Sequence, residues 1–152
     1  NPKMIKIGKK KSLNNKNIKW IKLNAEKLPF RNNYFDKYII SFCLRNITDI
    51  KKSLCESFRV LKEGGEFFCM EFSTVNNPIV NSIYNKYISN VIPFLGSFVS
   101  DQKNSYEYLA QSIQRFPNQE ILKKELIKAG FIKVNYYNLF SGIVAIHKGW
   151  KI

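Results

Sequence analysis

Apolar side chains recur every three or four residues in the middle of the chain, and two glycines follow them. The recurring positions are Ile50, Leu54, Phe58 and Leu61. This spacing places them on one face of a helix, so we predict a helix over Asp49–Leu61. Glycine readily adopts the left-handed conformation that ends helices. We therefore expect Gly64 and Gly65 to end this helix.

Short apolar runs elsewhere predict strands. We expect them at Ile18–Leu23, Tyr38–Leu44 and Glu66–Ser73. The segment between the first two runs contains Pro29, which cannot occupy a central strand, so we interpret it as a loop. Residues 67–72 are mostly apolar, which is typical of a parallel strand covered on both faces. Helices alternating with such strands predict an α/β fold.

The carboxy-terminal part predicts an antiparallel finish to the sheet. Asn118 caps a helix that Gly130 ends, and the strands Ile132–Phe140 and Ile143–Ile152 follow, joined by a tight turn. We expect the last strand to lie antiparallel beside residues 67–72. A dinucleotide-binding sheet would more often continue parallel. The finish therefore resembles the Rossmann-like sheet of class I S-adenosylmethionine-dependent methyltransferases.

Residues 76–116 break this alternation with two further helical patterns. They indicate either a lid inserted over one end of the sheet or a helical pair packed on the sheet or on another subunit. The start of the chain, residues 1–16, reads as the tail of a helix and a polar loop. The length of 152 residues fits one domain over 1–152.

The chain has a formal charge of +14, and residues 1–25 hold eight lysines and no acidic residue. Such a surplus attracts nucleic acid or an anionic membrane. We favour a solvated lysine face, because no arginine and few aromatic residues are interleaved there. A nucleic-acid-binding module would use both, so we expect no nucleic acid partner.

Cysteine and histidine usage argues against a metal centre. Cys43, Cys55 and Cys69 have no metal-binding spacing, and we expect them to be reduced core residues. His147 is the only histidine in the sequence and is expected to be structural. No run of about 18 apolar residues occurs, so we do not expect the chain to span a membrane.

Several stretches resemble the ubiquinone/menaquinone biosynthesis C-methyltransferase family. They are Asn24–Phe30, Ser41–Asp49, Arg59–Ser73, Ser105–Ile113, and Tyr136–Leu139 running into Gly142–Lys151. Glu63 departs from the family, which usually has proline there. The resemblance covers nearly the whole chain but corresponds to the carboxy-terminal two thirds of the family's domain. We therefore expect the first two strands, their glycine-rich turn and an acidic residue to be missing.

The resemblance implies a C-methyltransferase that moves a methyl group from S-adenosylmethionine to the ring of a polyprenyl benzoquinol in ubiquinone biosynthesis. One alternative is methylation of demethylmenaquinol. Another is a catalytically inactive fragment or a subunit of a quinone-synthesis complex. Because cofactor-binding groups are missing, we expect this chain alone to be inactive.

Ligands of open α/β sheets bind beyond the carboxyl ends of the strands. By resemblance, the Asn24 side chain and the Ala25 backbone contact adenine, and Ser41 also contacts the cofactor. Asn24 could instead make only a turn. Ser41 could instead be satisfied by backbone groups.

The resemblance assigns catalysis to Arg45 and Asn46. Arg45 would stabilise the phenolate or orient a water that accepts its proton, since a guanidinium stays charged and is a poor base. Alternatively, Arg45 caps the following helix or pairs with Asp49. The candidates for the acceptor pocket are Tyr106, Tyr108, Tyr136, Tyr137 and Asn138.

The implied substrate partitions into a bilayer. The resemblance therefore implies a peripheral protein on the matrix side of the inner mitochondrial membrane in a eukaryote, and a cytoplasmic one in a bacterium. Unpaired sheet edges favour association, so a homodimer or a quinone-biosynthesis complex is expected.

Overall fold

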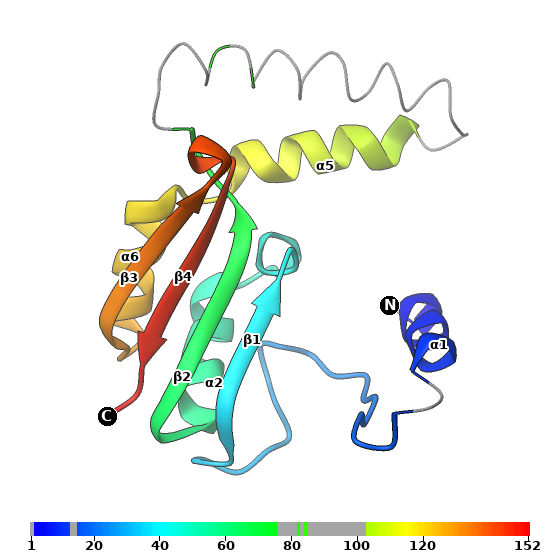
Figure 1. The fold of residues 1–152 in the computed structure, drawn as a ribbon, viewed down its shortest axis with the longest axis vertical. Coiled ribbons are helices and arrows are strands. Elements are labelled where there is room, and N and C mark those ends of the chain that lie inside the picture. The colour runs from blue at the N-terminus through cyan, green and yellow to red at the C-terminus, as the bar shows by residue number, and fades with distance from the viewer. Residues whose placement is uncertain (1, 13–14, 76–81, 83, 85–102) are drawn as a thin grey trace.

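The structure, a computed structural model, describes residues 2–12, 15–75, 82, 84 and 103–152 (Figure 1). Most of the predicted insertion 76–116 lies outside the described residues. The described part of it contains helix α5 (Lys103–Arg115).

Four strands form one mixed sheet in the order β1-β2-β4-β3. They are β1 (Phe35–Ser41), β2 (Leu61–Phe72), β3 (Ile132–Leu139) and β4 (Val144–Trp150). Strand β1 runs parallel to β2, while β4 lies antiparallel to both β2 and β3. The predicted antiparallel finish is confirmed, with Cys69 of β2 opposite His147 of β4.

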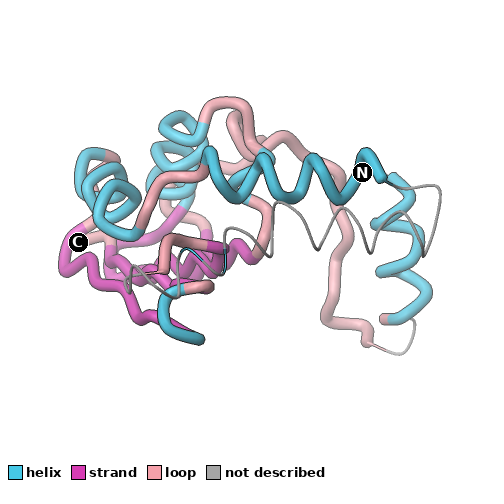
Figure 2. Tube along the Cα trace, turned by 90° about the horizontal axis from the view of Figure 1, so that it is seen from above, coloured by secondary structure: helices cyan, strands magenta, loops and turns pink. Residues whose placement is uncertain are grey.

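Helices α2 (Ile50–Val60) and α6 (Gln119–Lys128) lie on one face of this sheet (Figures 1 and 2). The core between helices and sheet contains Leu54, Leu61, Phe67, Cys69, Leu122, Leu126 and Phe131. Except for Phe131, which lies between α6 and β3, these residues come from one face of each helix and from alternate positions of β2, as amphipathic patterns require.

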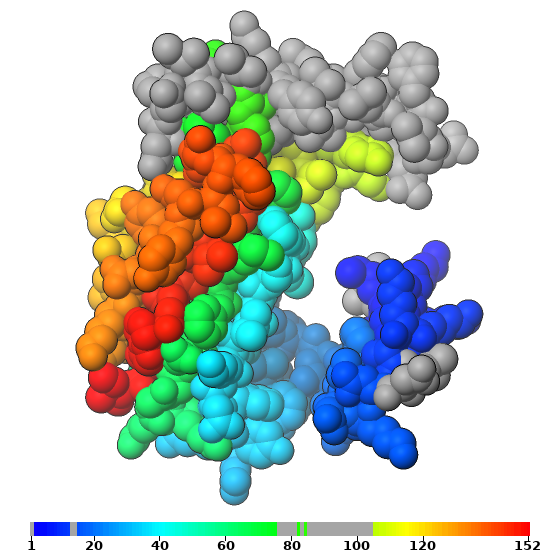
Figure 3. Space-filling model, in the orientation of Figure 1, coloured from blue at the N-terminus to red at the C-terminus, as the bar shows by residue number. Residues whose placement is uncertain are grey.

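The opposite face of the sheet is open within the described part of the chain (Figure 3). Burial alternates along β2, and exposed side chains on the flanking strands include Ile39 at 71% and Tyr137 at 63%. The expectation that residues 67–72 are covered on both faces is therefore wrong for the described chain. Both helices packed against the sheet lie on the same side of it.

Helix α6 begins and ends where the sequence predicted. The Asn118 side chain accepts a hydrogen bond from the Ile121 amide at 2.9 Å, which satisfies one of the free N–H groups of the first turn. At the other end Gly130 has φ +106°, and the Phe131 amide donates a hydrogen bond to the Leu126 carbonyl. Local chemistry alone fixes both ends.

Helix α2 ends earlier than the glycine pair. Its last residue is Val60, because Leu61 is already extended and continues directly into β2. Gly64 does have φ +77°, but it lies in a bulge of β2, and its amide donates a hydrogen bond to the Lys151 carbonyl. The glycines therefore bend a strand, and the expectation that they end the helix is wrong.

Residues 18–23 form no strand in the described part of the chain. A strand needs a neighbour that supplies N–H and C=O groups, and no described strand pairs with this segment. Trp20 instead turns to helix α1 (Pro2–Lys11), where its indole Nε1 donates to the Ser12 Oγ just beyond the helix. The strand expected at Ile18–Leu23 is thus extended chain.

Strand β1 also ends earlier than predicted. It stops at Ser41, because Phe42 takes a positive φ of 49° and the chain then winds into a 3₁₀ turn over Leu44–Asn46. A second 3₁₀ turn, Phe140–Gly142, joins β3 to β4.

The three cysteines do not share one environment. Cys69 is buried on β2, but Cys43 and Cys55 are exposed. The expectation of three core cysteines is therefore wrong, since Cys43 precedes the 3₁₀ turn at the sheet edge and Cys55 lies on the solvent side of α2.

Candidate functional site

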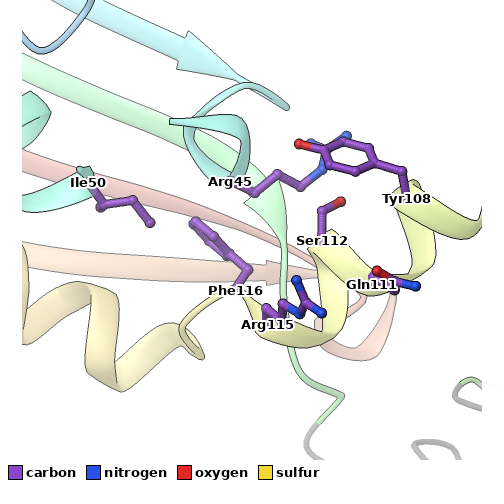
Figure 4. A pocket seen from close by; sticks show the side chains of 7 residues that line it. All are labelled: Arg45, Ile50, Tyr108, Gln111, Ser112, Arg115 and Phe116. Atoms are coloured by element: carbon purple, nitrogen blue, oxygen red, sulfur yellow. The ribbon is translucent and has the colours of Figure 1, made fainter. Parts of the chain in front are cut away.

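A cavity of about 170 Å³ lies between the turn after β1 and helix α5 (Figure 4). Its lining residues are Arg45, Ile50, Tyr108, Gln111, Ser112, Arg115 and Phe116. The cavity lies at the end of the sheet where β1 and β2 finish, which is where open α/β sheets bind ligands. The turn after β1 and helix α5, which are far apart in the sequence, both contribute side chains to it.

The 3₁₀ turn fixes the backbone of Arg45. Leu44 is only 1% exposed and anchors the turn in the core. Within the turn, the Asn46 amide donates to the Cys43 carbonyl at 3.0 Å and the Ile47 amide donates to Leu44 at 3.1 Å. Arg45 is consequently held at the sheet edge.

The Arg45 guanidinium pairs with a buried carboxylate. Its Nη1 lies 2.6 Å from Oε1 of Glu71, and the side chains are 10% and 2% exposed. The alternative pairing with Asp49 is wrong, because Asp49 caps α2 and accepts a hydrogen bond from the Lys52 amide. The carboxylate partner comes from β2, not from the following helix.

One Arg45 donor is left without a partner. Its Nε is buried and makes no hydrogen bond to the described residues. The guanidinium carbon lies 5.3 Å from the centre of the Phe72 ring, which favours a cation. A buried N–H without a partner is costly. Because Nε itself is buried, a ligand in the cavity would meet the part of Arg45 that lines it.

Asn46 and the predicted Tyr106 border a second, more open hollow of about 320 Å³. It is lined by Arg45, Asn46, Ser105, Tyr106, Tyr108 and Leu109. The Tyr108 hydroxyl donates to Asn46 Oδ1 at 2.9 Å, between the two hollows. The structure therefore brings Arg45, Asn46 and Tyr106 together.

Asn24 and Ala25 lie in a loop that is fastened to α2. The Asn24 Oδ1 accepts a hydrogen bond from the Glu26 amide, so this side chain does form a turn. Arg59 of α2 holds the following residues, donating to the carbonyls of Leu28 and Phe30. The amide group of Asn24 keeps its two N–H donors, which suit a purine edge.

The Arg59 guanidinium also clasps Glu56. Two of its nitrogens lie 2.7 and 2.8 Å from the Glu56 oxygens. This contact lowers the pKa of the Glu56 carboxyl to about 2. The loop that carries Asn24 thus depends on an ionised carboxylate.

Ser41 is exposed at the carboxyl end of β1. Its hydroxyl makes no hydrogen bond to the described residues, so backbone groups do not satisfy it there. Ser41 thus remains available as the predicted cofactor contact.

Tyr137 and Asn138 lie on β3, outside both hollows. Asn138 Oδ1 accepts a hydrogen bond from Gln119 Nε2 at 3.1 Å, and Tyr137 is 63% exposed. Of the other tyrosines, Tyr136 donates to Glu120 on α6. The described structure does not join these residues to Arg45.

Sequence reasoning missed Glu71 and the α5 residues Ser112 and Arg115. The signal for Glu71 was present, because it is a carboxylate within the apolar run 67–72. Ser112 lies within the family-like stretch Ser105–Ile113 but was given no role there, and Arg115 lies outside every such stretch. The packing of α5 against the turn brings both to the cavity.

His147 is buried on β4, 2% exposed, with Nε2 placed 3.0 Å from the Gln119 carbonyl. Burial lowers the pKa of this imidazole. Among the described residues no group of three His, Cys, Asp or Glu side chains is placed to hold a metal. No described helix is long and apolar enough to cross a membrane.

Comparison with known proteins gives close relatives for the whole chain. Residues 1–151 match the model of the ubiE/COQ5 methyltransferase family. Proteins named 2-methoxy-6-polyprenyl-1,4-benzoquinol methylase, mitochondrial, from Xenopus laevis and Homo sapiens, are each 48% identical over 155 residues. The alignment covers all of this chain but 50% and 47% of those proteins, so the chain spans about half their length.

Solved structures share the fold at low identity. A SAM-dependent methyltransferase from Thermotoga maritima, described as a possible histamine N-methyltransferase, aligns with a TM-score of 0.68 at 20% identity, over 99% of this chain and 70% of that one. A SAM-dependent methyltransferase from Aquifex aeolicus aligns with a TM-score of 0.67 at 14% identity, over 100% and 65%. The predicted methyltransferase fold class is confirmed.

Proposed function

Because the chain belongs to the ubiE/COQ5 methyltransferase family, we propose that the whole protein transfers a methyl group from S-adenosylmethionine to a ring carbon of a polyprenyl benzoquinol in ubiquinone biosynthesis. The observation that carries this proposal is 48% identity, across the entire chain, to proteins named as benzoquinol methylases. The site at the carboxyl ends of β1 and β2 supports it, since that is where such folds bind ligands.

The residues present suit a bound S-adenosylmethionine at the same edge. Asn24 offers amide donors, the Ala25 backbone lies beside it, and the Ser41 hydroxyl has no partner among the described residues. The cofactor supplies a methyl group bound to a positively charged sulfur. Asn24, Ala25 and Ser41 are proposed to hold it with that methyl group directed towards Arg45.

Arg45 and Asn46 are proposed to act on the quinol. A ring carbon becomes nucleophilic when the neighbouring phenol loses its proton, so a cation beside the oxygen lowers the barrier. The Arg45 guanidinium lines both hollows and supplies such a cation, beside that phenolate or beside a water that accepts the proton. Asn46 and Tyr106 border the hollow in which the ring would lie.

The complete protein, purified and given S-adenosylmethionine carrying a labelled methyl group, tests the proposal. With a reduced polyprenyl methoxybenzoquinol, labelled product should form on the ring carbon. The oxidised quinone is the matched control, because it has no phenolic proton to lose and should not react. An enzyme that labels only demethylmenaquinol, or neither quinol, would contradict the proposal.

We propose further that the protein is peripheral to the inner mitochondrial membrane, on its matrix side. The relatives are named as mitochondrial, and the formal charge of +14 favours anionic lipid. We also propose that it associates as a homodimer or within a quinone-biosynthesis complex, and that it acts at the bilayer where the polyprenyl tail resides. Flotation with cardiolipin-containing liposomes at low and high salt tests this, and failure to bind at either salt would contradict it.

A further inference from the structure

Glu71 is a carboxylate in the middle of the sheet. Glu71 is 1% exposed, and its side chain lies on the face of β2 that also carries Phe67 and Cys69. Opposite it on β4 stands Ala145, whose side chain is a single methyl group. Burying a carboxylate costs free energy unless donors surround it.

Three donors do surround this carboxylate, and two of them belong to Arg45. Oε1 accepts from Arg45 Nη1 at 2.6 Å and from the Phe72 amide at 3.0 Å. Oε2 accepts from the Arg45 backbone amide at 3.4 Å. Glu71 thus contacts both the main chain and the side chain of Arg45.

This double contact restricts the guanidinium to one orientation. One end is held on Glu71 and one face lies against Phe72, while the buried Nε remains without a partner among the described residues. A guanidinium is planar and rigid, so holding Nη1 on Glu71 and one face on Phe72 fixes the orientation of the whole group. Without Glu71 the long arginine side chain would be free to rotate.

From this arrangement we infer that Glu71 is a positioning residue: it fixes the Arg45 guanidinium, which lines both hollows, in the orientation that stabilises the acceptor oxygen during methyl transfer. The inference rests on the proposed function and extends it to a second residue. Glu71 lines neither hollow, so it acts through Arg45 and does not touch the substrate. Misplacing a catalytic group by about 1 Å can cost about 100-fold in rate.

The variant Glu71→Gln in the complete protein tests this. Glutamine has nearly the same shape as glutamate, but its NH2 group replaces one of the two acceptor oxygens. That NH2 group would face a backbone N–H, donor against donor, so the contact with Arg45 is disturbed. We expect kcat to fall about 100-fold, with KM for the quinol and the Kd of S-adenosylmethionine within roughly twofold of wild type. Wild-type kcat in a folded Glu71→Gln variant would overturn the inference.

Glu66→Gln is the matched control. Glu66 lies on the same strand and is also paired, to Lys37 and Lys148, but away from Arg45. It should leave kcat unchanged. A loss equal to that of Glu71→Gln would show a general effect of carboxylates on this strand and would overturn the inference.

A double-mutant cycle separates positioning from structural support. In an Arg45→Lys background the geometry is already lost, so Glu71→Gln should change kcat little further. Independent, multiplying losses would overturn the inference. If Glu71→Gln does not fold, Glu71→Asp replaces it, because the charge stays and the carboxylate withdraws by one methylene. Lowered kcat in folded Glu71→Asp supports the inference, and unchanged kcat overturns it.

The two proposals fail differently. If the wild-type protein methylates no quinol, the proposed function fails. If wild type is active and Glu71→Gln is equally active, only the positioning role fails.

Discussion

The Tyr108 hydroxyl donates a hydrogen bond of 2.9 Å to Oδ1 of Asn46 and so joins α5 to the turn after β1. Tyr108 lines both hollows that Arg45 lines, and Asn46 lines the larger one. Because Tyr108 is 56% exposed, water competes for the bond, and its net contribution lies at the low end for hydrogen bonds.

Tyr108→Phe should therefore loosen α5 over the site. We expect KM for the quinol to rise about threefold, with the Kd of S-adenosylmethionine unchanged. Steady-state kinetics and calorimetry measure the two values. Tyr34→Phe, at the opposite end of β1, is the control, and an equal rise in KM there would contradict the assignment.

Arg45→Lys should separate chemistry from cofactor binding. Lysine keeps the charge but has no planar group that can pair with Glu71 and also line the hollows, so kcat should fall about 100-fold while the cofactor Kd stays unchanged. Asn24→Ala should do the reverse and raise the Kd of S-adenosylmethionine about fivefold, because one amide contact is lost. Parallel small losses in both variants would leave these residues with structural roles only.

Acid should weaken the ion pair between Arg59 and Glu56. The folded-state pKa of Glu56 is about 2, against an ordinary value of 4.5. Its contribution to the free energy of unfolding is therefore complete above pH 4.5 and is lost as pH falls towards 2. Urea midpoints across this range should fall less steeply for Glu56→Gln than for wild type, whereas the exposed Glu63→Gln should follow wild type.

His147 should make stability depend on pH in a higher range. Burial lowers its pKa in the folded protein, so below the ordinary value of 6.5 the unfolded chain binds more protons. Stability should be complete above pH 6.5 and decrease as pH falls. His147→Gln, whose amide can still donate to the Gln119 carbonyl, should reduce the difference in Tm between pH 7 and pH 5. If the difference in Tm stays as large in the variant as in wild type, titratable groups other than His147 cause it.

Gly142 and Gly64 form a matched pair with φ values of +99° and +77°. Alanine at either position costs about 1–2 kcal/mol for the left-handed backbone. At Gly142 the new methyl group would also lie 2.9 Å from the Thr74 carbonyl, while at Gly64 it meets nothing within 4 Å. Gly142→Ala should therefore lower Tm more than Gly64→Ala, and thermal melts that rank them otherwise would contradict the steric argument.

Local sequence signals predicted the elements whose ends are fixed by neighbouring residues. The cap of Asn118, the left-handed Gly130 and the start of α2 after Asp49 all depend on groups within a few positions along the chain. The antiparallel pairing of β3 with β4 was predictable for the same reason, since a short turn joins them, whereas the place of β4 beside β2 was expected from the resemblance. Arg45 and Asn46 were found through a motif at the end of β1.

Tertiary structure alone decided the features that depend on distant partners. The pattern of Ile18–Leu23 suits a strand, but pairing requires a neighbour that no local pattern supplies. The coverage of β2 on one face and the arrival of α5 at the Arg45 turn depend on packing between elements.

The ion pair between Arg45 and Glu71 shows most clearly which features the sequence determines and which depend on the tertiary structure. Each residue was visible in the sequence, as a motif arginine and as a carboxylate in an apolar strand. Their contact exists only because β1 and β2 lie side by side, with Ser41 opposite Met70 at the strand end. The sequence by itself determined which chemical groups are available, while the sheet determined which of them meet, because a buried charge is stable only beside a partner that the fold brings to it.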